Sequence, residues 1–232
     1  MRGIFVTGTD TNAGKTFASS LIIRALVDRG FSVAGLKPIA CGFEQVDGEW
    51  QHPDVVALTE AANVDLPKET VNRYAFKPRL SPHIAARQEN VTVSIEKIRE
   101  DAGEAARQAD FVLVEGAGGW HVPLDWPEDG KPCTDIATMA VALELPVVLV
   151  VGLRLGCLNH ALLTANAILH SGLPMLGWVA NHVDPKFGFR DENVATLEAI
   201  LPAPKLLEIP HLDDAADLSE SNVDLSGILS VI

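Results

Sequence analysis

Residues 3–16 of the chain read GIFVTGTDTNAGKT. The start of this stretch is apolar and rich in β-branched residues, as expected of a buried strand, and the pattern from Phe17 to Arg29 predicts a helix. A strand, a glycine-bearing loop, Gly-Lys-Thr and a helix in this order are typical of a phosphate-binding loop. Such a loop holds phosphate oxygens on backbone N–H groups at the positive end of the helix dipole. We therefore predict nucleoside triphosphate binding, with Lys15 on the outer phosphates and Thr16 on Mg²⁺.

The loop departs from the usual spelling of Gly, four residues, then Gly-Lys-[Ser/Thr]. Thr9 stands where the first glycine belongs, and Gly8 lies one position too early. The alternative is a chance Gly-Lys-Thr at the start of a helix. The flanking strand and helix and the position near the N-terminus favour a functional loop, because such a motif needs that context.

The bulk properties indicate one α/β domain over residues 1–232. The longest apolar stretch, residues 145–151, is too short to cross a bilayer, and we expect no targeting segment and no membrane partner. Three widely separated cysteines fit a reduced cytoplasm better than a disulfide framework. The net charge of −13 argues against a nucleic-acid partner, whose phosphates need a basic face.

Strand and helix signals alternate along the chain, which predicts a P-loop NTPase-like α/β fold with a mostly parallel sheet and helices on both faces. The expected strands are residues 3–7, 32–36, 111–114, 145–151, 178–180 and 205–209. The expected helices are residues 16–29, 53–62, 82–87, 94–109, 134–144, 159–171 and 191–201. Residues 38–53 and 64–82 are expected to be irregular connections.

Three of these strands end in candidate site residues, and ligands bind at the carboxyl ends of parallel strands. The first strand ends at the phosphate loop, the second at Lys37-Pro38 and the third at Glu115-Gly116, so all three should open onto one crevice. Lys37, at the tip of an expected central strand, could neutralise a transferring phosphoryl group opposite Lys15. The alternative for Lys37 is an ordinary surface lysine at a strand end.

Acids and glycines near these strand ends extend the candidate site. Glu115 follows four apolar residues, and since Thr16 already predicts a nearby Mg²⁺, we favour a metal ligand over a solvent-facing acid. Asp54, taken alone, is an ordinary acid in the first turn of a helix. Gly116, Gly118 and Gly119 would let the backbone approach a ligand closely. The seven histidines have no metal-ligand spacing and are expected at the surface or as helix caps.

The motifs, taken in order, resemble the dethiobiotin synthetase family over roughly residues 3 to 212. The matching segments are residues 8–11 with 14–16, then 35–38, 81–83, 114–119, 156–161 and 177–181. The resemblance implies an ATP-dependent ligase of biotin biosynthesis. One amine of 7,8-diaminononanoate (7,8-diaminopelargonate) takes up CO₂ as a carbamate, and the carbamate attacks the γ-phosphate of MgATP. The second amine then closes the cyclic urea and releases phosphate.

The resemblance also implies roles for individual residues. The catalytic residues would be Lys37, Lys15 and Thr11, and Mg²⁺ would be held by Thr16, Asp54 and Glu115. The nucleotide would contact Asn12, Ala13, Gly14, Lys15, Thr16, Phe17, Asp54, Glu115, Gly116, Ala117, Gly118, Asn181, His182, Pro210, His211, Leu212 and Asp217. The diamine would contact Thr11, Lys37, Cys41, Gly118, Gly119, Gly156, Cys157, Leu158 and Asn159.

The family resemblance further implies a homodimer with its site at the subunit interface. The loop and helix start at residues 156–160 would receive the substrate carboxylate from across that interface, because a helix N-terminus suits an anion. Two departures bear on affinity. Cys41 stands where we expect a serine near the substrate amine, and Asn12 replaces a residue that is often acidic in the family.

Three alternatives remain open at this point. A partitioning-type ATPase would carry a signature lysine where this chain has Asp10. A cobyrinate-type amide synthetase would need a glutamine-hydrolysing domain with a nucleophilic cysteine. A small-molecule kinase would leave a phosphorylated product.

Overall fold

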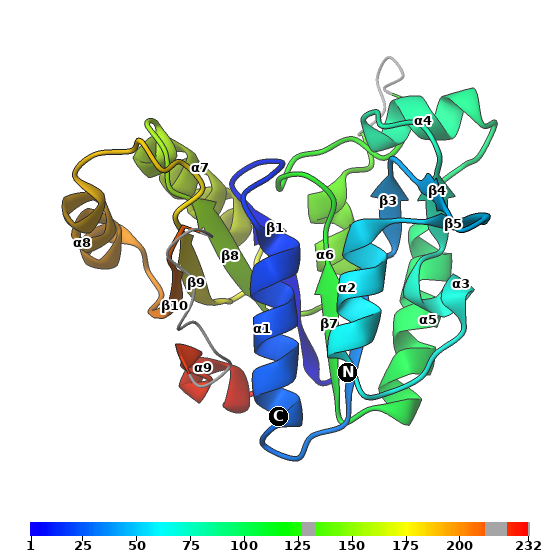
Figure 1. Ribbon diagram of the computed structural model, residues 1–232, viewed down its shortest axis with the longest axis horizontal. Coiled ribbons are helices and arrows are strands. Elements are labelled where there is room, and N and C mark those ends of the chain that lie inside the picture. The colour runs from blue at the N-terminus through cyan, green and yellow to red at the C-terminus, as the bar shows by residue number, and fades with distance from the viewer. Residues whose placement is uncertain (127–132, 212–221, 232) are drawn as a thin grey trace.

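A six-stranded parallel sheet forms the centre of the protein (Figure 1). The structure is a computed structural model, and it describes residues 1–126, 133–211 and 222–231. The strand order is β10-β9-β8-β1-β7-β2. The strands are β1 (Gly3–Gly8), β2 (Val33–Leu36), β7 (Phe111–Glu115), β8 (Val147–Gly152), β9 (Met175–Asn181) and β10 (Lys205–Ile209). The predicted α/β class with a parallel sheet is confirmed.

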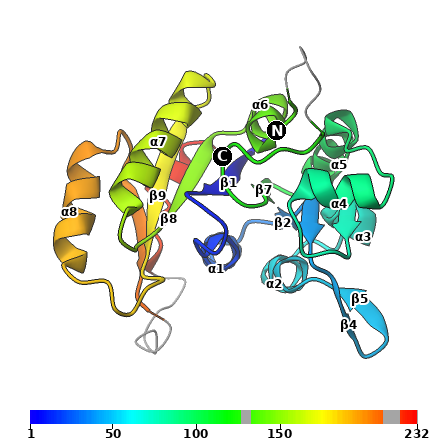
Figure 2. The same ribbon diagram turned by 90° about the horizontal axis from the view of Figure 1, so that it is seen from above.

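Helices cover both faces of this sheet. They are α1 (Lys15–Val27), α2 (Pro53–Ala61), α3 (Lys68–Val71), α4 (Pro82–Gln88), α5 (Ile95–Gln108), α6 (Ile136–Leu143), α7 (Cys157–His170), α8 (Arg190–Ile200) and α9 (Ser226–Leu229). Seen from above, α1 and α2 lie on one side of the sheet, and α5, α6 and α7 lie on the other (Figure 2). Each face has its own cluster of buried apolar side chains, so the strands are apolar on both sides.

Two of the expected irregular segments contain short ordered elements, so that prediction was wrong in part. The strands β3 (Ile39–Cys41) and β6 (Tyr74–Phe76) pair in parallel, and β4 (Glu44–Val46) and β5 (Glu49–Gln51) form a hairpin. Each of these strands has only three residues, and such a length is too short for a period of two to stand out in the sequence.

The position of β2 also corrects an expectation. We expected Lys37 at the tip of a central strand, but β2 pairs with β7 alone and forms an edge of the sheet. The segment from α3 to β6 covers this edge, since the Lys37 amide donates to the Val71 carbonyl at 2.9 Å. Lys37 is therefore buried although its strand is peripheral.

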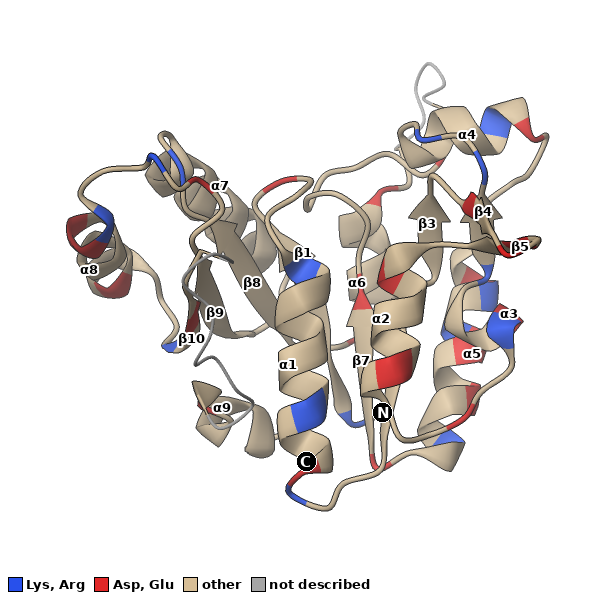
Figure 3. Ribbon diagram, viewed as in Figure 1, with Lys and Arg blue, Asp and Glu red and all other residues tan. Residues whose placement is uncertain are grey.

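Charged side chains are distributed over the outer helices. Both α5 and α8 carry acidic and basic residues (Figure 3). Across the residues that the structure describes, no helix combines the length and the apolar character needed to cross a membrane.

Candidate active site

The phosphate loop joins β1 to α1 and is braced by the neighbouring strands. The Thr9 amide donates to the Val150 carbonyl at 2.9 Å, and the Asn181 side-chain amide donates to the Ala13 carbonyl at 2.9 Å. Gly14 has a φ of 88°, and a Cβ at this position would overlap the Asn181 amide nitrogen. Only glycine meets both conditions at position 14, because it tolerates positive φ and has no Cβ.

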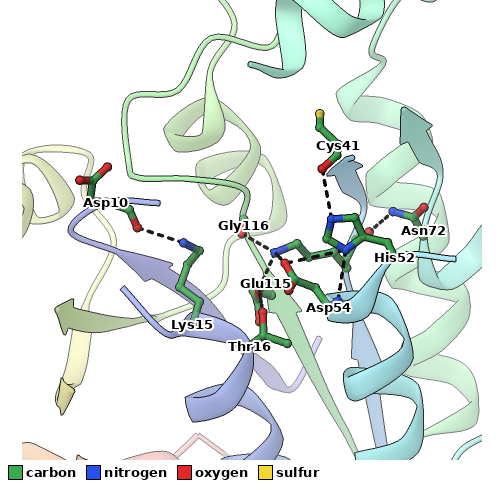
Figure 4. Close-up of polar contacts among 10 residues, drawn as sticks. Asp10, Lys15, Thr16, Cys41, His52, Asp54, Asn72, Glu115 and Gly116 are labelled. Atoms are coloured by element: carbon green, nitrogen blue, oxygen red, sulfur yellow. Dashed lines mark hydrogen bonds and ion pairs between the residues drawn. The ribbon is translucent and has the colours of Figure 1, made fainter. Parts of the chain in front are cut away.

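Lys15 is folded back onto its own loop. Its Nζ donates to the Asp10 carbonyl at 3.1 Å (Figure 4). Burial is the main cause that lowers the pKa of Lys15 to about 8, and the nearby positive charge of Lys37 acts in the same direction. Because the Asp10 carbonyl is a neutral acceptor, triphosphate oxygens could replace it as the hydrogen-bond partner of Lys15.

Lys37 lies at the centre of a buried cluster of oxygen atoms. Its Nζ contacts Glu115 Oε1, lies 2.9 Å from Asp54 Oδ2 and donates to the Gly116 carbonyl at 3.3 Å. Burial disfavours the charged ammonium, but attraction to Glu115 and Asp54 outweighs that effect and raises the pKa of Lys37. The same attraction overcomes burial at Asp54 and lowers the pKa of that carboxyl. Lys37 is thus a fixed cation, and the alternative of a surface lysine is excluded.

The predicted magnesium ligands converge on one place. Thr16 Oγ1 donates to Glu115 Oε1 at 2.8 Å, and Asp54 approaches from the start of α2 (Figure 4). Glu115 is fully buried, and its Oε2 has no hydrogen-bond partner in the described part of the chain. A hydroxyl and two carboxylates form the all-oxygen set that Mg²⁺ prefers when substrate phosphates supply further ligands. The residues present therefore fit a magnesium ion.

His52 fixes the orientation of Asp54. Its Nδ1 accepts the Asp54 amide at 3.2 Å, and its Nε2 donates to the Cys41 carbonyl at 3.1 Å. The predicted capping role is confirmed for this histidine, which is the N-cap of α2. His182 departs from the same prediction, because it is buried and its Nε2 donates to Glu208 Oε1 at 2.9 Å.

A cavity of about 810 Å³ opens beside these groups. The predicted site residues that line it are Thr11, Asn12, Gly14, Lys15, Thr16, Phe17, Lys37, Cys41, Asp54, Ala117 and Gly118. The sequence predicted no binding or catalytic role for several further wall residues, namely Ile39, Ala40, Gly42, Glu44, His52, Pro53, Arg79, Leu80, Ser81, Pro82, Ile84 and Val122. Of these, only Ser81 and Pro82 had a signal, as part of a family motif. The cavity wall thus combines the charged groups at the phosphate loop with apolar side chains and two further charged residues, Glu44 and Arg79.

Cys41 lines the cavity. Burial raises the pKa of its thiol to about 11, and the negative charge of Glu89 acts in the same direction. The side chain is thus a neutral thiol at physiological pH.

The glycine-rich segment after β7 packs against the phosphate loop. The Gly116 amide donates to the Val6 carbonyl at 2.9 Å. Gly118 has a φ of 69°, and a Cβ there would lie 2.9 Å from Val122 and 3.5 Å from Thr11 Oγ1. A Cβ on Gly119 would lie 3.5 Å from the Gly8 carbonyl oxygen. This segment therefore lies beside Thr11 and the end of β1, and its predicted approach to a ligand stays a prediction.

Other predicted site residues lie apart from the cavity wall. Gly156, Cys157, Leu158 and Asn159 form the start of α7 and do not line it. Asn181, His182, Pro210 and His211 follow β9 and β10, where Asn181 contacts the phosphate loop. Leu212 and Asp217 lie outside the described residues.

Comparison with known proteins identifies the family. A family model described as "AAA domain" matches residues 2–219. A protein of Cellvibrio japonicus named ATP-dependent dethiobiotin synthetase BioD is 44% identical over 229 residues, which cover 98% of both chains. The chain belongs to the dethiobiotin synthetase family. A second member with the same name, from Ralstonia nicotianae, is 47% identical over 97% of this chain and 96% of its own.

Solved structures share the fold of this dethiobiotin synthetase family member at low identity. The septum site-determining protein MinD of Pyrococcus horikoshii, complexed with Mg-ADP, has a TM-score of 0.55 at 16% identity, over 100% of this chain and 86% of its own. A ParA family ATPase of Chlorobium tepidum has a TM-score of 0.55 at 14% identity, over 100% and 93%. These similarities establish the P-loop NTPase-like fold and carry no functional argument.

Proposed function

We propose that the protein is an ATP-dependent dethiobiotin synthetase, a cyclo-ligase of biotin biosynthesis. It joins CO₂ to 7,8-diaminononanoate and closes the ring to dethiobiotin, with release of ADP and phosphate. Membership of the family supports this reaction. Within the structure, one observation carries the proposal: Lys15, Lys37 and Asp54 line one cavity, and the buried Glu115 contacts Lys37 behind its wall.

The reaction has an electrostatic problem that this cavity solves. A carbamate, formed from one amine and CO₂, must approach the γ-phosphate of ATP, and both groups are anionic. Lys15 leaves the Asp10 carbonyl to bind the outer phosphates, and Lys37 stands beside the path of the carbamate oxygen. Attack on phosphorus forms a carbamic-phosphoric anhydride and releases ADP. The second amine then attacks the carbonyl carbon, and the carbon–oxygen bond to phosphate breaks.

Thr16, Asp54 and Glu115 would hold Mg²⁺ in this proposal. The ion would neutralise charge on the β- and γ-phosphates when bound. Lys37 bridges Asp54 and Glu115 in the nucleotide-free structure, so the two acids already share a cation. Binding of the ion would allow the Lys37 ammonium to turn toward the reacting anions.

We also propose a homodimer in which α7 of one copy completes the site of the other. Leu155 is 91% exposed and Leu163 is 62% exposed on this part of the surface. Large side chains at such exposure fit a protein interface. Gly156, with a φ of 95°, caps α7 and leaves its N-terminal amides free of a side-chain cap. These amides would bind the substrate carboxylate from the partner copy.

The remaining assignments concern the nucleotide base and the location. Asn181, His182, Pro210 and His211 would surround the adenine, and the contact of Asn181 with the phosphate loop supports this assignment. A cytoplasmic location is consistent with the three free cysteines, because a reducing compartment keeps thiols unpaired. We propose no nucleic-acid or membrane partner.

The partitioning-type ATPase is the main alternative, and Asp10 argues against it. Where that class has its signature lysine, Asp10 pairs with Arg154 at 2.5 Å within the same chain. The acid neutralises a cation here, so the position has the opposite charge from the one that the alternative needs.

Phosphate release from ATP tests the proposed function. We expect release that requires both the diamine and bicarbonate, with dethiobiotin as the product detected by mass spectrometry. Hydrolysis that is independent of the diamine would favour an ATPase switch, and a phosphorylated product would favour a kinase. Either result would overturn the proposal.

A further inference from the structure

Two asparagines hold the two ends of the edge strand β2. At its start, Asn63 Oδ1 accepts the Val33 amide at 2.7 Å, and Asn63 Nδ2 donates to the Phe31 carbonyl at 3.0 Å. At its end, Asn72 Nδ2 donates to the Lys37 carbonyl at 2.5 Å. Asn72 is 9% exposed, so its contact with Lys37 is shielded from water.

The end of β2 needs such support more than an ordinary strand end. Lys37 lies just beyond the ladder to β7, whose register ends at Leu36. The next residue, Pro38, has no amide hydrogen and restricts the backbone of Lys37 to extended conformations. What remains free is the tilt of the peptide plane between Lys37 and Pro38, and the carbonyl in that plane is the one that Asn72 holds.

The segment from residue 71 to residue 74 therefore fixes Lys37 from both sides. The Lys37 amide donates to the Val71 carbonyl at 2.9 Å, and the Tyr74 amide donates to the Pro38 carbonyl at 2.8 Å. Asn72 supplies the side-chain contact between these two backbone contacts. The Lys37 ammonium is carried by a flexible chain of four methylene groups. Its position among Glu115, Asp54 and Gly116 therefore depends on a fixed backbone.

We propose that Asn72 is a positioning residue for Lys37 in the ring-closing reaction. The inference rests on the proposed function, and it adds a residue that does not line the cavity. Loss of the amide donor would leave the buried Lys37 carbonyl unsatisfied, and the peptide plane would turn to find another partner. The ammonium would then move relative to the carbamate and the γ-phosphate, while the phosphate loop would stay intact.

The test compares Asn72→Leu with Asn63→Leu. Both variants replace an asparagine that hydrogen-bonds the backbone at one end of β2 by an apolar residue of similar size, but only Asn72→Leu touches Lys37. Asn63 is exposed and Asn72 is buried, so Tm is measured for both variants. We expect kcat to fall roughly 10- to 100-fold in Asn72→Leu, the range known for small displacements of reacting groups. The Kd for ATP without the diamine should stay within about twofold of wild type, since the phosphate loop is unchanged. In Asn63→Leu, kcat should stay near wild type even where its Tm falls equally.

A second readout does not depend on turnover. An amine-specific reagent, followed by peptide mass spectrometry, reports how well Lys37 is shielded relative to the exposed Lys97 in the same sample. We expect faster labelling of Lys37 in Asn72→Leu and no change in Asn63→Leu. Asn72→Ser keeps a hydroxyl donor and a smaller volume, and it should give an intermediate kcat; it replaces Asn72→Leu if that variant does not fold.

The outcomes separate the inference from the proposed function. Wild-type protein that forms no dethiobiotin overturns the proposed function itself. Active wild type, with equal kcat and equal Lys37 labelling in the Asn63 and Asn72 variants, overturns the inference alone.

Discussion

The region around Lys37 and the N-terminal end of α7 are both predicted to bind substrate, yet they differ in every physical respect. Lys37 is 3% exposed and contacts three oxygen-bearing groups, whereas Leu155 beside the start of α7 is 91% exposed. The first region lines the cavity, and the second does not. In the proposed dimer, a single chain would provide the phosphate and metal half of the site, and a second copy would provide the carboxylate half.

Removal of the Lys37 charge should have the largest effect on turnover, and it tests the buried region. We expect Lys37→Ala and Lys37→Gln to lower kcat by about 100- to 1,000-fold, as loss of one group that stabilises a transition-state charge does. Steady-state phosphate release is the measurement. Lys37→Gln keeps a donor for Glu115 and controls for lost stability, because breaking a buried ion pair costs about 3–5 kcal/mol. Near-normal turnover in a folded variant would remove Lys37 from the mechanism.

Gly14→Ala tests whether the phosphate loop is complete without help from a partner. Its Cβ would overlap the Asn181 amide, so we expect ATP binding to weaken by about 5- to 150-fold, as backbone strain of roughly 1–3 kcal/mol predicts. Isothermal titration calorimetry measures the loss. Gly30→Ala is the matched control, since Gly30 has a φ of 89° and no described atom within 4 Å of an added Cβ. Equal ATP affinity in the two variants would contradict the prediction.

Charges introduced at the exposed leucines around the start of α7 should affect the proposed dimer interface and leave the Lys37 region unchanged. We expect the Leu155→Asp/Leu163→Asp double variant to shift the protein toward monomer, because buried unpaired carboxylates oppose association. The KM for the diamine should rise, and the Kd for ATP should stay unchanged. Analytical ultracentrifugation and steady-state kinetics measure these effects, with Leu229→Asp in α9 as an exposed control. A fully active monomer would show that one chain suffices.

The smallest expected effect concerns the rate at which Cys41 is chemically modified, which reports on the interior of the cavity. Since its pKa is raised to about 11, the thiolate is the minor form below that pH. We expect iodoacetamide to modify Cys41 about tenfold faster for each pH unit between 8 and 10, as the thiolate fraction rises. Peptide mass spectrometry follows the rate, and the denatured protein provides the reference. A rate that levels off near pH 8.5 would contradict the raised pKa.

The sequence predicts the centre of the site better than its walls. Lys37 directly follows β2, Glu115 ends β7, and Lys15 lies at the end of the loop that follows β1. The rule that ligands lie at the carboxyl ends of parallel strands therefore predicted correctly that they share one edge of the sheet. Arg79 and Leu80 line the cavity from a proline-containing segment without clear periodicity, which offers no such rule.

Tertiary packing decided the features that sequence patterns missed. The edge position of β2 depends on which strands pair, and an apolar run of four residues reads the same at an edge or at the centre. His182 is buried because Glu208, 26 residues later, lies on the adjacent strand. Neither relation is encoded within a local window of sequence.

The bridge from Lys37 to Asp54 and Glu115 has a consequence for folding. The ammonium acts as an internal counter-ion, so both carboxylates are neutralised in the folded, nucleotide-free protein. In a variant without this cation, dissolved divalent ions would neutralise the two carboxylates instead. Its melting temperature would then climb with magnesium concentration by mass action, and that of the wild type would climb less, because there the ion must first displace an amine already in place.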